Sequence, residues 1–247
     1  MKIELNITMR CNLGCPNCNR MCNIYRDRTE DMSIDQIKRF IEQAKLLPEQ
    51  KRKVKIVGGE PLLHPNIAEI NDIFAEAVEK KWLSSVKYGT NKIITNSNKL
   101  PPEFKKSPFV RFSGMISRKK KHLPYLQSPV DMGWKKGDEP LPKRMCSQIR
   151  RCGFSLDKYG YLPCSLAIMI VRLFGWTDLY RYEIPRVPWE LERICKHCIL
   201  SMGKGWCNQH AKYFKNMTPE DSIPSKTFKE AMDKFNLELF HQTQKEF

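Results

Sequence analysis

The chain has 247 residues, 41% of them hydrophobic, which is enough for one full-sized domain with a packed core, with or without a small appendage. Its formal net charge of +16 favours polyanionic partners or anionic substrates but specifies no fold. No apolar run approaches the ~18–20 residues of a membrane span, so we expect no membrane-spanning helix. The N-terminus also lacks a secretory signal pattern, so we expect a cytoplasmic protein without membrane partners.

Strands and helices are predicted to alternate over the first half of the chain. Residues 3–8 form an apolar strand, and Ser33 is a helix N-cap before apolar residues at helical spacing, up to Pro48. Further strands are expected over 54–57, 86–95 and 110–114, with a second helix over 67–78. Such alternation is typical of parallel βαβ units and therefore predicts an α/β fold.

Each of these strands leads into a polar or sulfur-bearing motif. The motifs are Cys11, Cys15 and Cys18 after the first strand, Gly58-Gly59-Glu60 after the second, Thr95-Asn96 after the third, and Ser113 in the fourth. In parallel α/β barrels the chemistry lies at the carboxyl ends of the strands. We therefore expect the four motifs to share one rim.

The three N-terminal cysteines have the spacing C-x3-C-x2-C. Three thiolates can hold three irons of a cubic [4Fe–4S] cluster and leave the fourth iron open to another ligand, whereas four cysteines close the cluster. An open iron is typical of an enzyme, and a closed cluster is typical of an electron carrier. A zinc site with Cys22 as fourth ligand is the alternative.

The cysteine motif and the Gly-Gly-Glu motif together resemble the radical S-adenosylmethionine (radical SAM) enzymes. The resemblance implies a partial (β/α) TIM-like barrel, and a [4Fe–4S] cluster on Cys11, Cys15 and Cys18 whose open iron binds S-adenosylmethionine. It further implies that Gly58, Gly59 and Glu60 contact the methionyl amino group, and it makes Thr95, Asn96 and Ser113 weaker candidates for cofactor contacts. The family usually has an aromatic residue where this chain has Asn17, so adenine packing falls to another residue such as Tyr25.

A second set of cysteines begins after a polar, basic segment over residues 115–145. These cysteines stand at 146, 152, 164, 195, 198 and 207, around a hairpin expected over 153–164, and an amphipathic helix is expected over 228–240. The pattern resembles the auxiliary-cluster region called twitch, the half-sized relative of the SPASM domain. That resemblance implies an auxiliary [4Fe–4S] cluster on Cys164, Cys195, Cys198 and one further cysteine. Family spacing favours Cys146 for that place and hairpin geometry favours Cys152, while a zinc ribbon is the alternative.

The predicted organisation is a radical SAM partial barrel over 1–145, an auxiliary-cluster region over 146–210 and a helical segment over 211–247. The resemblance implies that S-adenosylmethionine is cleaved, with an external one-electron reductant, to a 5′-deoxyadenosyl radical that abstracts hydrogen from substrate. We expect a small polar metabolite or a nucleotide as substrate, with a nucleic-acid base second and a ribosomal peptide third. An iron–sulfur electron carrier or a zinc-binding module is the non-enzymatic alternative. The sequence assigns no general acid or base.

Overall fold

The structure, a computed structural model, describes residues 2–13, 18–22, 30–48, 52–91, 110–115, 126–132, 153–184, 191–202, 224–236, 240 and 246–247. The first half alternates as expected: β1 (Lys2–Asn6), α1 (Ile34–Ala44), β2 (Lys53–Val57), α2 (Ile67–Glu79), β3 (Ser85–Asn91) and β4 (Val110–Met115). The second half contains β5 (Phe154–Asp157), β6 (Gly160–Leu162), α6 (Ser165–Leu173), α7 (Glu192–Cys195) and α9 (Lys226–Lys234). Short 3-10 turns cover Pro61–Leu63, Pro129–Met132, Thr177–Leu179 and Ile199–Met202.

The strands form one six-stranded sheet in the order β4-β3-β2-β1-β5-β6. All neighbours from β4 to β5 are parallel, and only β6 runs antiparallel, to β5. This confirms the α/β class. The hairpin β5–β6 extends the main sheet beside β1, and the sequence pattern did not indicate this long-range pairing.

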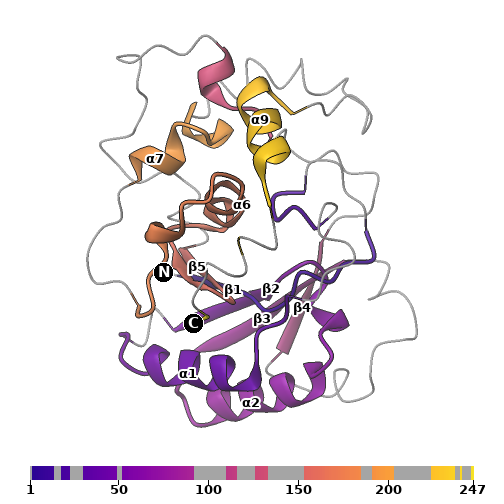
Figure 1. The fold of residues 1–247 in the computed structure, drawn as a ribbon. Coiled ribbons are helices and arrows are strands. Elements are labelled where there is room, and N and C mark those ends of the chain that lie inside the picture. Colours follow the sequence, from indigo (N-terminus) through magenta and orange to yellow (C-terminus); the bar gives the residue numbers. More distant parts are fainter. Residues whose placement is uncertain are drawn as a thin grey trace.

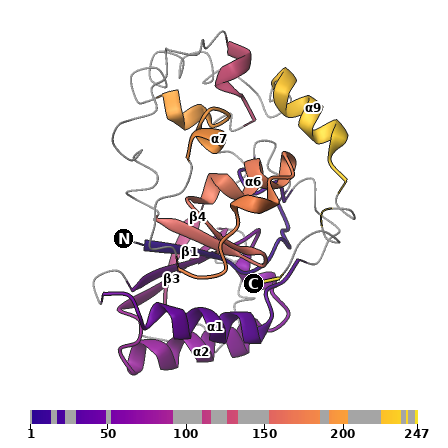
Figure 2. The same cartoon turned by 60° about the vertical axis from the view of Figure 1, so that its left-hand side comes forward.

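Helices cover both faces of the sheet (Figures 1 and 2). Helices α1 and α2 lie on one face, and α6 lies on the other, with α7 and α9 beyond it. On the first face Leu5, Ile56 and Tyr88 from three adjacent strands belong to one core with Phe40 of α1 and Phe74 of α2. A second core surrounds α6, whose residues are all buried. The sheet therefore separates two apolar layers.

Local signals set several element ends. Ser33 caps α1 in a capping box, in which its hydroxyl accepts from the Gln36 amide and the Gln36 side chain accepts from the Ser33 amide. The helix expected over 228–240 is interrupted: α9 covers Lys226–Lys234, Phe235 has extended backbone angles, and Phe240 is helical again. None of the helices within the described ranges is long and apolar enough to cross a membrane. The boundary expected at 145–146 lies outside the described residues and stays a prediction.

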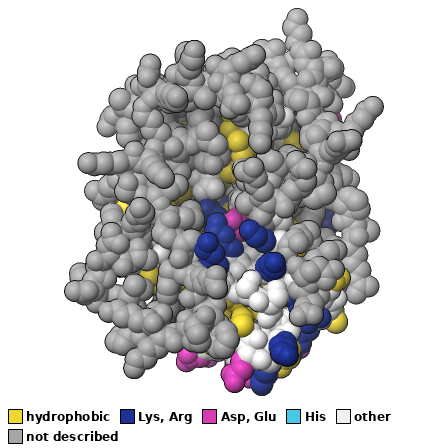
Figure 3. Space-filling view, turned by 180° about the vertical axis from the view of Figure 1, so that it is seen from behind, with side chains coloured by type: hydrophobic (Ala, Val, Ile, Leu, Met, Phe, Trp, Pro, Cys, Tyr) yellow, Lys and Arg dark blue, Asp and Glu magenta, His cyan; other side chains and the backbone are white. Residues whose placement is uncertain are grey.

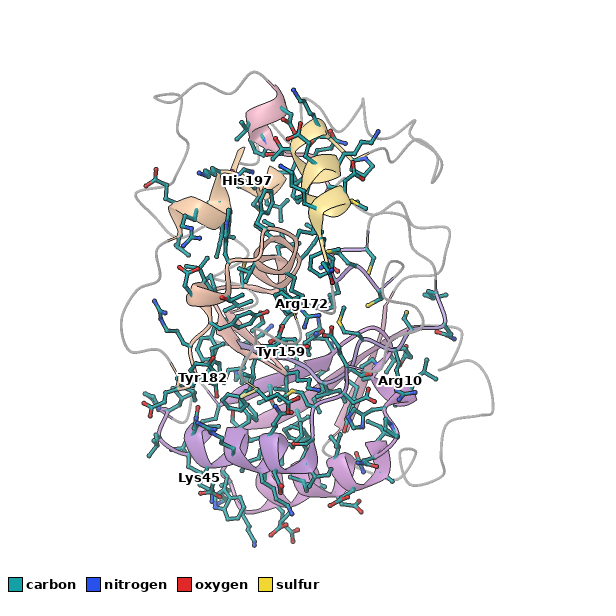
Figure 4. All side chains as sticks on the ribbon, in the orientation of Figure 1. Arg10, Lys45, Tyr159, Arg172, Tyr182 and His197 are labelled. Carbon is teal, nitrogen blue, oxygen red and sulfur yellow. The ribbon has the colours of Figure 1, made fainter. Side chains whose placement is uncertain are left out.

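A buried ion triad ties the two halves of the chain together. Arg172 of α6 donates to Glu30 at 2.6 Å and to Asp157, at the end of β5, at 2.9 Å. All three side chains are at most 3% exposed. Arg172 also lies over the Tyr159 ring, between α6 and the sheet (Figure 4). The segment that follows the N-terminal cysteines is thereby fastened to the hairpin and to α6.

Candidate functional site

The end of β1 carries the start of the cysteine loop, and the chain returns to the same place after the loop. The Met32 amide donates to the Ile7 carbonyl at 2.8 Å, and the Met9 amide donates to the Glu30 carbonyl at 3.2 Å. Arg10 forms an ion pair of 2.9 Å with Asp31. Both ends of the loop that contains Cys11, Cys15 and Cys18 are therefore anchored beside β1.

The Gly-Gly-Glu motif at the end of β2 lies directly against this loop. The Gly59 amide donates to the Thr8 carbonyl at 2.8 Å, and the Glu60 amide donates to the Arg10 carbonyl at 2.7 Å. A Cβ on Gly59 would lie 2.1 Å from the Arg10 carbonyl oxygen and 2.9 Å from the Cys11 Cβ. Glycine is required here because no side chain fits between the two backbones. The Gly-Gly-Glu motif therefore sets the position of Cys11. The cofactor contacts that the sequence predicts for this motif would be a second role.

Glu60 is fully buried, and its carboxylate accepts from the Leu62 amide at 3.1 Å. It thereby caps the 3-10 turn Pro61–Leu63 that follows β2. This capping bond orients the carboxylate within the protein. A backbone contact to the methionyl amino group, as the sequence analysis predicts, would not require the carboxylate to move.

Two sulfur atoms of the cysteine loop interact with each other. A hydrogen bond from Cys22 is the main reason why the pKa of the Cys18 thiol is lowered to about 6, and Arg20 contributes in the same direction. The same hydrogen bond and burial raise the pKa of Cys22 well above its ordinary value. Cys18 is therefore prepared as a thiolate, which is the form that binds iron, while Cys22 stays a thiol. Cys15 lies outside the described residues.

Behind the cysteine loop lies a charged network that the sequence analysis missed. Arg20 donates to Glu4 at 3.3 Å and to Asn6 at 3.1 Å, and Lys55 donates to Glu4 at 3.0 Å. Burial opposes ionisation of Glu4, yet Arg20 and Lys55 outweigh it and lower the pKa of this carboxyl. Alternation along β1 and β2 places Glu4, Asn6 and Lys55 on the sheet face away from α1 and α2, which is a signal the sequence did contain.

The remaining candidates at the rim are only partly described. Ser113 lies in β4 opposite Gly89 of β3. Thr95, Asn96, Asn17 and Tyr25 lie outside the described residues, as do Cys146, Cys152 and Cys207 of the second set. Their predicted roles stay predictions.

The described members of the second cysteine set lie around α6 and α7. Cys164 precedes α6 and is 8% exposed, Cys195 ends α7, and the Cys198 amide donates to the Cys195 carbonyl at 3.1 Å. Among the described residues, no three His, Cys, Asp or Glu side chains are grouped closely enough to hold a metal ion. The fourth ligand predicted for this set is Cys146 or Cys152, so the auxiliary cluster stays a prediction.

His197, between these two cysteines, has a packing role. It lies at a ring-centroid distance of 4.6 Å from Phe174, and its Nδ1 is 3.1 Å from the Ser128 hydroxyl. Burial lowers the pKa of His197 to about 4, so the ring is neutral at physiological pH. Figure 4 shows it among the helices above α6, away from the sheet. Asp131, in the 3-10 turn Pro129–Met132, accepts hydrogen bonds from the amide and the hydroxyl of Thr227 at the start of α9.

Comparison with known proteins finds similarity to a protein family, to a sequence relative and to a solved structure. Residues 5–116 match the family model of the radical SAM superfamily. A 95-residue stretch is 33% identical to a probable GTP 3′,8-cyclase of Methanococcus maripaludis (strain C5), and the match covers 37% of this chain and 28% of the cyclase. The crystal structure of BtrN in complex with AdoMet and 2-DOIA aligns over 95% of this chain and 86% of BtrN, with a TM-score of 0.36 and 13% identity.

Proposed function

We propose that this chain is a radical SAM enzyme, which the family match over residues 5–116 supports. It cleaves S-adenosylmethionine reductively and uses the resulting radical to abstract a hydrogen atom from a small polar metabolite or a nucleotide. The observation that carries the proposal is the pair of hydrogen bonds from Gly59 and Glu60 to Thr8 and Arg10. They bring the Gly-Gly-Glu motif and the first cysteine of the C-x3-C-x2-C motif to one point of the rim.

The residues present fit an open-site cluster. Cys11, Cys15 and Cys18 would hold it. Because the pKa of Cys18 is lowered, this side chain favours the thiolate form that binds iron. A bound [4Fe–4S] cluster supplies one electron to the sulfonium of S-adenosylmethionine, which yields methionine and a 5′-deoxyadenosyl radical. Three cysteines of the motif would hold three irons, and the raised pKa of Cys22 opposes its binding to the fourth, which would then be open to S-adenosylmethionine.

The proposal is tested by anaerobic reconstitution with iron and sulfide, followed by incubation with dithionite and S-adenosylmethionine. We expect 5′-deoxyadenosine and methionine in equal amounts by mass spectrometry, and Cys11→Ala should abolish both. Zinc in place of iron in the purified protein would contradict the proposal. Intact iron clusters without any cleavage would favour an electron carrier.

The second cysteine set is proposed to hold an auxiliary [4Fe–4S] cluster that accepts one electron from the substrate radical. Loss of that electron and of a proton completes a two-electron oxidation of the substrate after the hydrogen atom has moved to 5′-deoxyadenosine. Cys164, Cys195 and Cys198 are its described ligand candidates, and the C-x2-C spacing of Cys195 and Cys198 supports the proposal.

Replacement of both Cys195 and Cys198 by Ala should remove about four of about eight irons per chain. We expect 5′-deoxyadenosine to form still, because the N-terminal cluster lies on a different loop. Iron is measured by plasma mass spectrometry, with Cys11→Ala as the complementary variant that loses the other cluster. An unchanged iron content would exclude a cluster at these cysteines, and loss of one zinc would identify a zinc ribbon instead.

A further inference from the structure

The sheet face away from α1 and α2 carries several lysines. In β3, Val86 and Tyr88 belong to the core beneath these helices, so Lys87 between them is on the opposite face. In β2 the same alternation puts Lys53 and Lys55 opposite Val54 and Ile56. We call Lys53, Lys55 and Lys87, together with the buried Arg20 beside them, the cationic face.

Strand register places these cations side by side. Glu4 of β1 pairs with Lys55 of β2, and Lys55 pairs with Lys87 of β3. Neighbouring strands are about 4.8 Å apart, so the Lys55 and Lys87 ammonium groups can contact the same multiply charged anion. Lys53 lies in the adjacent row, one step towards the strand starts.

The charge on this face is only partly compensated. Glu4 is shared between Arg20 and Lys55, and the Lys55 side chain remains 29% exposed. Lys53 and Lys87 are exposed and form no ion pair with any described residue. Figure 3, the view from behind, shows Lys and Arg side chains gathered around an acidic one. Exposed, uncompensated cations at this spacing favour a bound anion.

The cationic face is continuous with the site at the rim. Arg20 stands two residues after Cys18, and its guanidinium contacts Glu4 and Asn6 on this face. Along β2, Lys55 precedes Gly58 by three residues, which is about 10 Å of extended strand. A small phosphorylated molecule can therefore contact Lys55 and Lys87 through its phosphate while another of its atoms reaches the rim.

We infer that the cationic face is the part of the substrate site that binds a phosphate group, and that the substrate is a small phosphate ester or polyphosphate. Lysine suits this task because its ammonium is a compact charge with three donors. A carboxylate would need only one such cation, whereas paired lysines on adjacent strands match a group with two or more negative charges. The inference rests on the proposed function and narrows its substrate class.

The test measures the binding of inorganic pyrophosphate to the reconstituted protein by calorimetry. Lys55→Gln and Lys87→Gln should each weaken binding about tenfold, which is about 1.4 kcal/mol, because each removes one charge-assisted hydrogen bond. Lys45→Gln is the matched control for Lys55→Gln, because Lys45 is 28% exposed, pairs with Glu42, and lies on the helix side of the sheet. Lys38→Gln, on the exposed surface of α1, is the control for Lys87→Gln.

Glu4→Gln provides a test of opposite sign. This substitution removes the negative charge that pairs with Lys55, so pyrophosphate should bind several-fold tighter. The Gln side-chain oxygen can still accept a hydrogen bond from Arg20. Thermal unfolding of each variant shows that it has folded. Equal effects of all four lysine substitutions, or weaker binding to Glu4→Gln, would overturn the inference.

Two further binding experiments distinguish a small phosphate ester from a nucleic acid as the ligand. Uridine monophosphate should compete with pyrophosphate and uridine should not. A single-stranded oligonucleotide that binds tightly, while pyrophosphate does not bind at all, would overturn the inference in favour of nucleic acid. Formation of 5′-deoxyadenosine by the wild-type protein tests the proposed function separately. If the wild-type protein forms 5′-deoxyadenosine but Lys87→Gln binds pyrophosphate as tightly as the wild type, the phosphate site is refuted and the proposed function is not.

Discussion

Gly59→Ala is expected to abolish formation of 5′-deoxyadenosine and to remove the iron of the N-terminal cluster. The added methyl group would lie 2.1 Å from the Arg10 carbonyl oxygen and 2.7 Å from its carbonyl carbon, and both atoms belong to backbone. Backbone cannot rotate away as a side chain can, so the strand end of β2 and the start of the cysteine loop must separate. Cys11 moves with Arg10, and the three thiolates then no longer match one cluster.

Gly175→Ala is the control for this substitution. Gly175 has a φ of +64°, and a Cβ there would meet nothing within 4 Å. The alanine carries the left-handed backbone cost of about 1–2 kcal/mol without any clash. Iron content and 5′-deoxyadenosine formation should therefore equal those of the wild type, whereas Gly59→Ala should be destabilised by about 1–3 kcal/mol and lose both properties. Full iron loading of Gly59→Ala would show that the close packing does not position Cys11.

Features governed by short-range signals were predictable from the sequence. The Ser33 cap depends on a residue three positions away, and the alternation of strands and helices depends on local periodicity. The Gly-Gly-Glu motif was recognised, but its packing against Thr8 and Arg10 joins residues about fifty positions apart. A sequence motif gives the residue types but not the distant residues that they contact. The packing role of Gly59 could therefore not be deduced from the sequence.

The charged side chains of the interior were the least predictable part. Arg20 reads as one of many basic residues in a chain of charge +16, yet it is buried against Glu4 and Asn6. The position of the β5–β6 hairpin beside β1 was unpredictable for the same reason. Parallel pairing between strands about 150 residues apart leaves no pattern in the local sequence. Burial of a charge depends on which elements meet, and that information appears only once the sheet order is known.

Arg172→Met is expected to cause the largest loss of stability, about 3–5 kcal/mol, because it removes the guanidinium that both buried carboxylates pair with. Glu30 and Asp157 are each at most 3% exposed and both pair with Arg172. Methionine keeps much of the side-chain volume and contact with Tyr159, so the loss reports charge more than packing. Anaerobic urea unfolding of the reconstituted protein, followed by tryptophan fluorescence, measures it. Arg193→Met, which breaks an exposed pair with Asp178, should cost no more than about 1 kcal/mol.

The pH dependence separates this electrostatic cause from a packing defect. Burial raises the pKa of Asp157 even though Arg172 opposes the shift, and without Arg172 the pKa should rise further. An acid whose pKa is higher in the folded state contributes stability that is present below its unfolded pKa of about 3.9 and is lost as pH rises through the folded value. The deficit of Arg172→Met relative to the wild type should therefore be larger at pH 8 than at pH 5. A deficit that stays constant over this range would mean that lost packing, and not the uncompensated carboxylates, destabilises the variant.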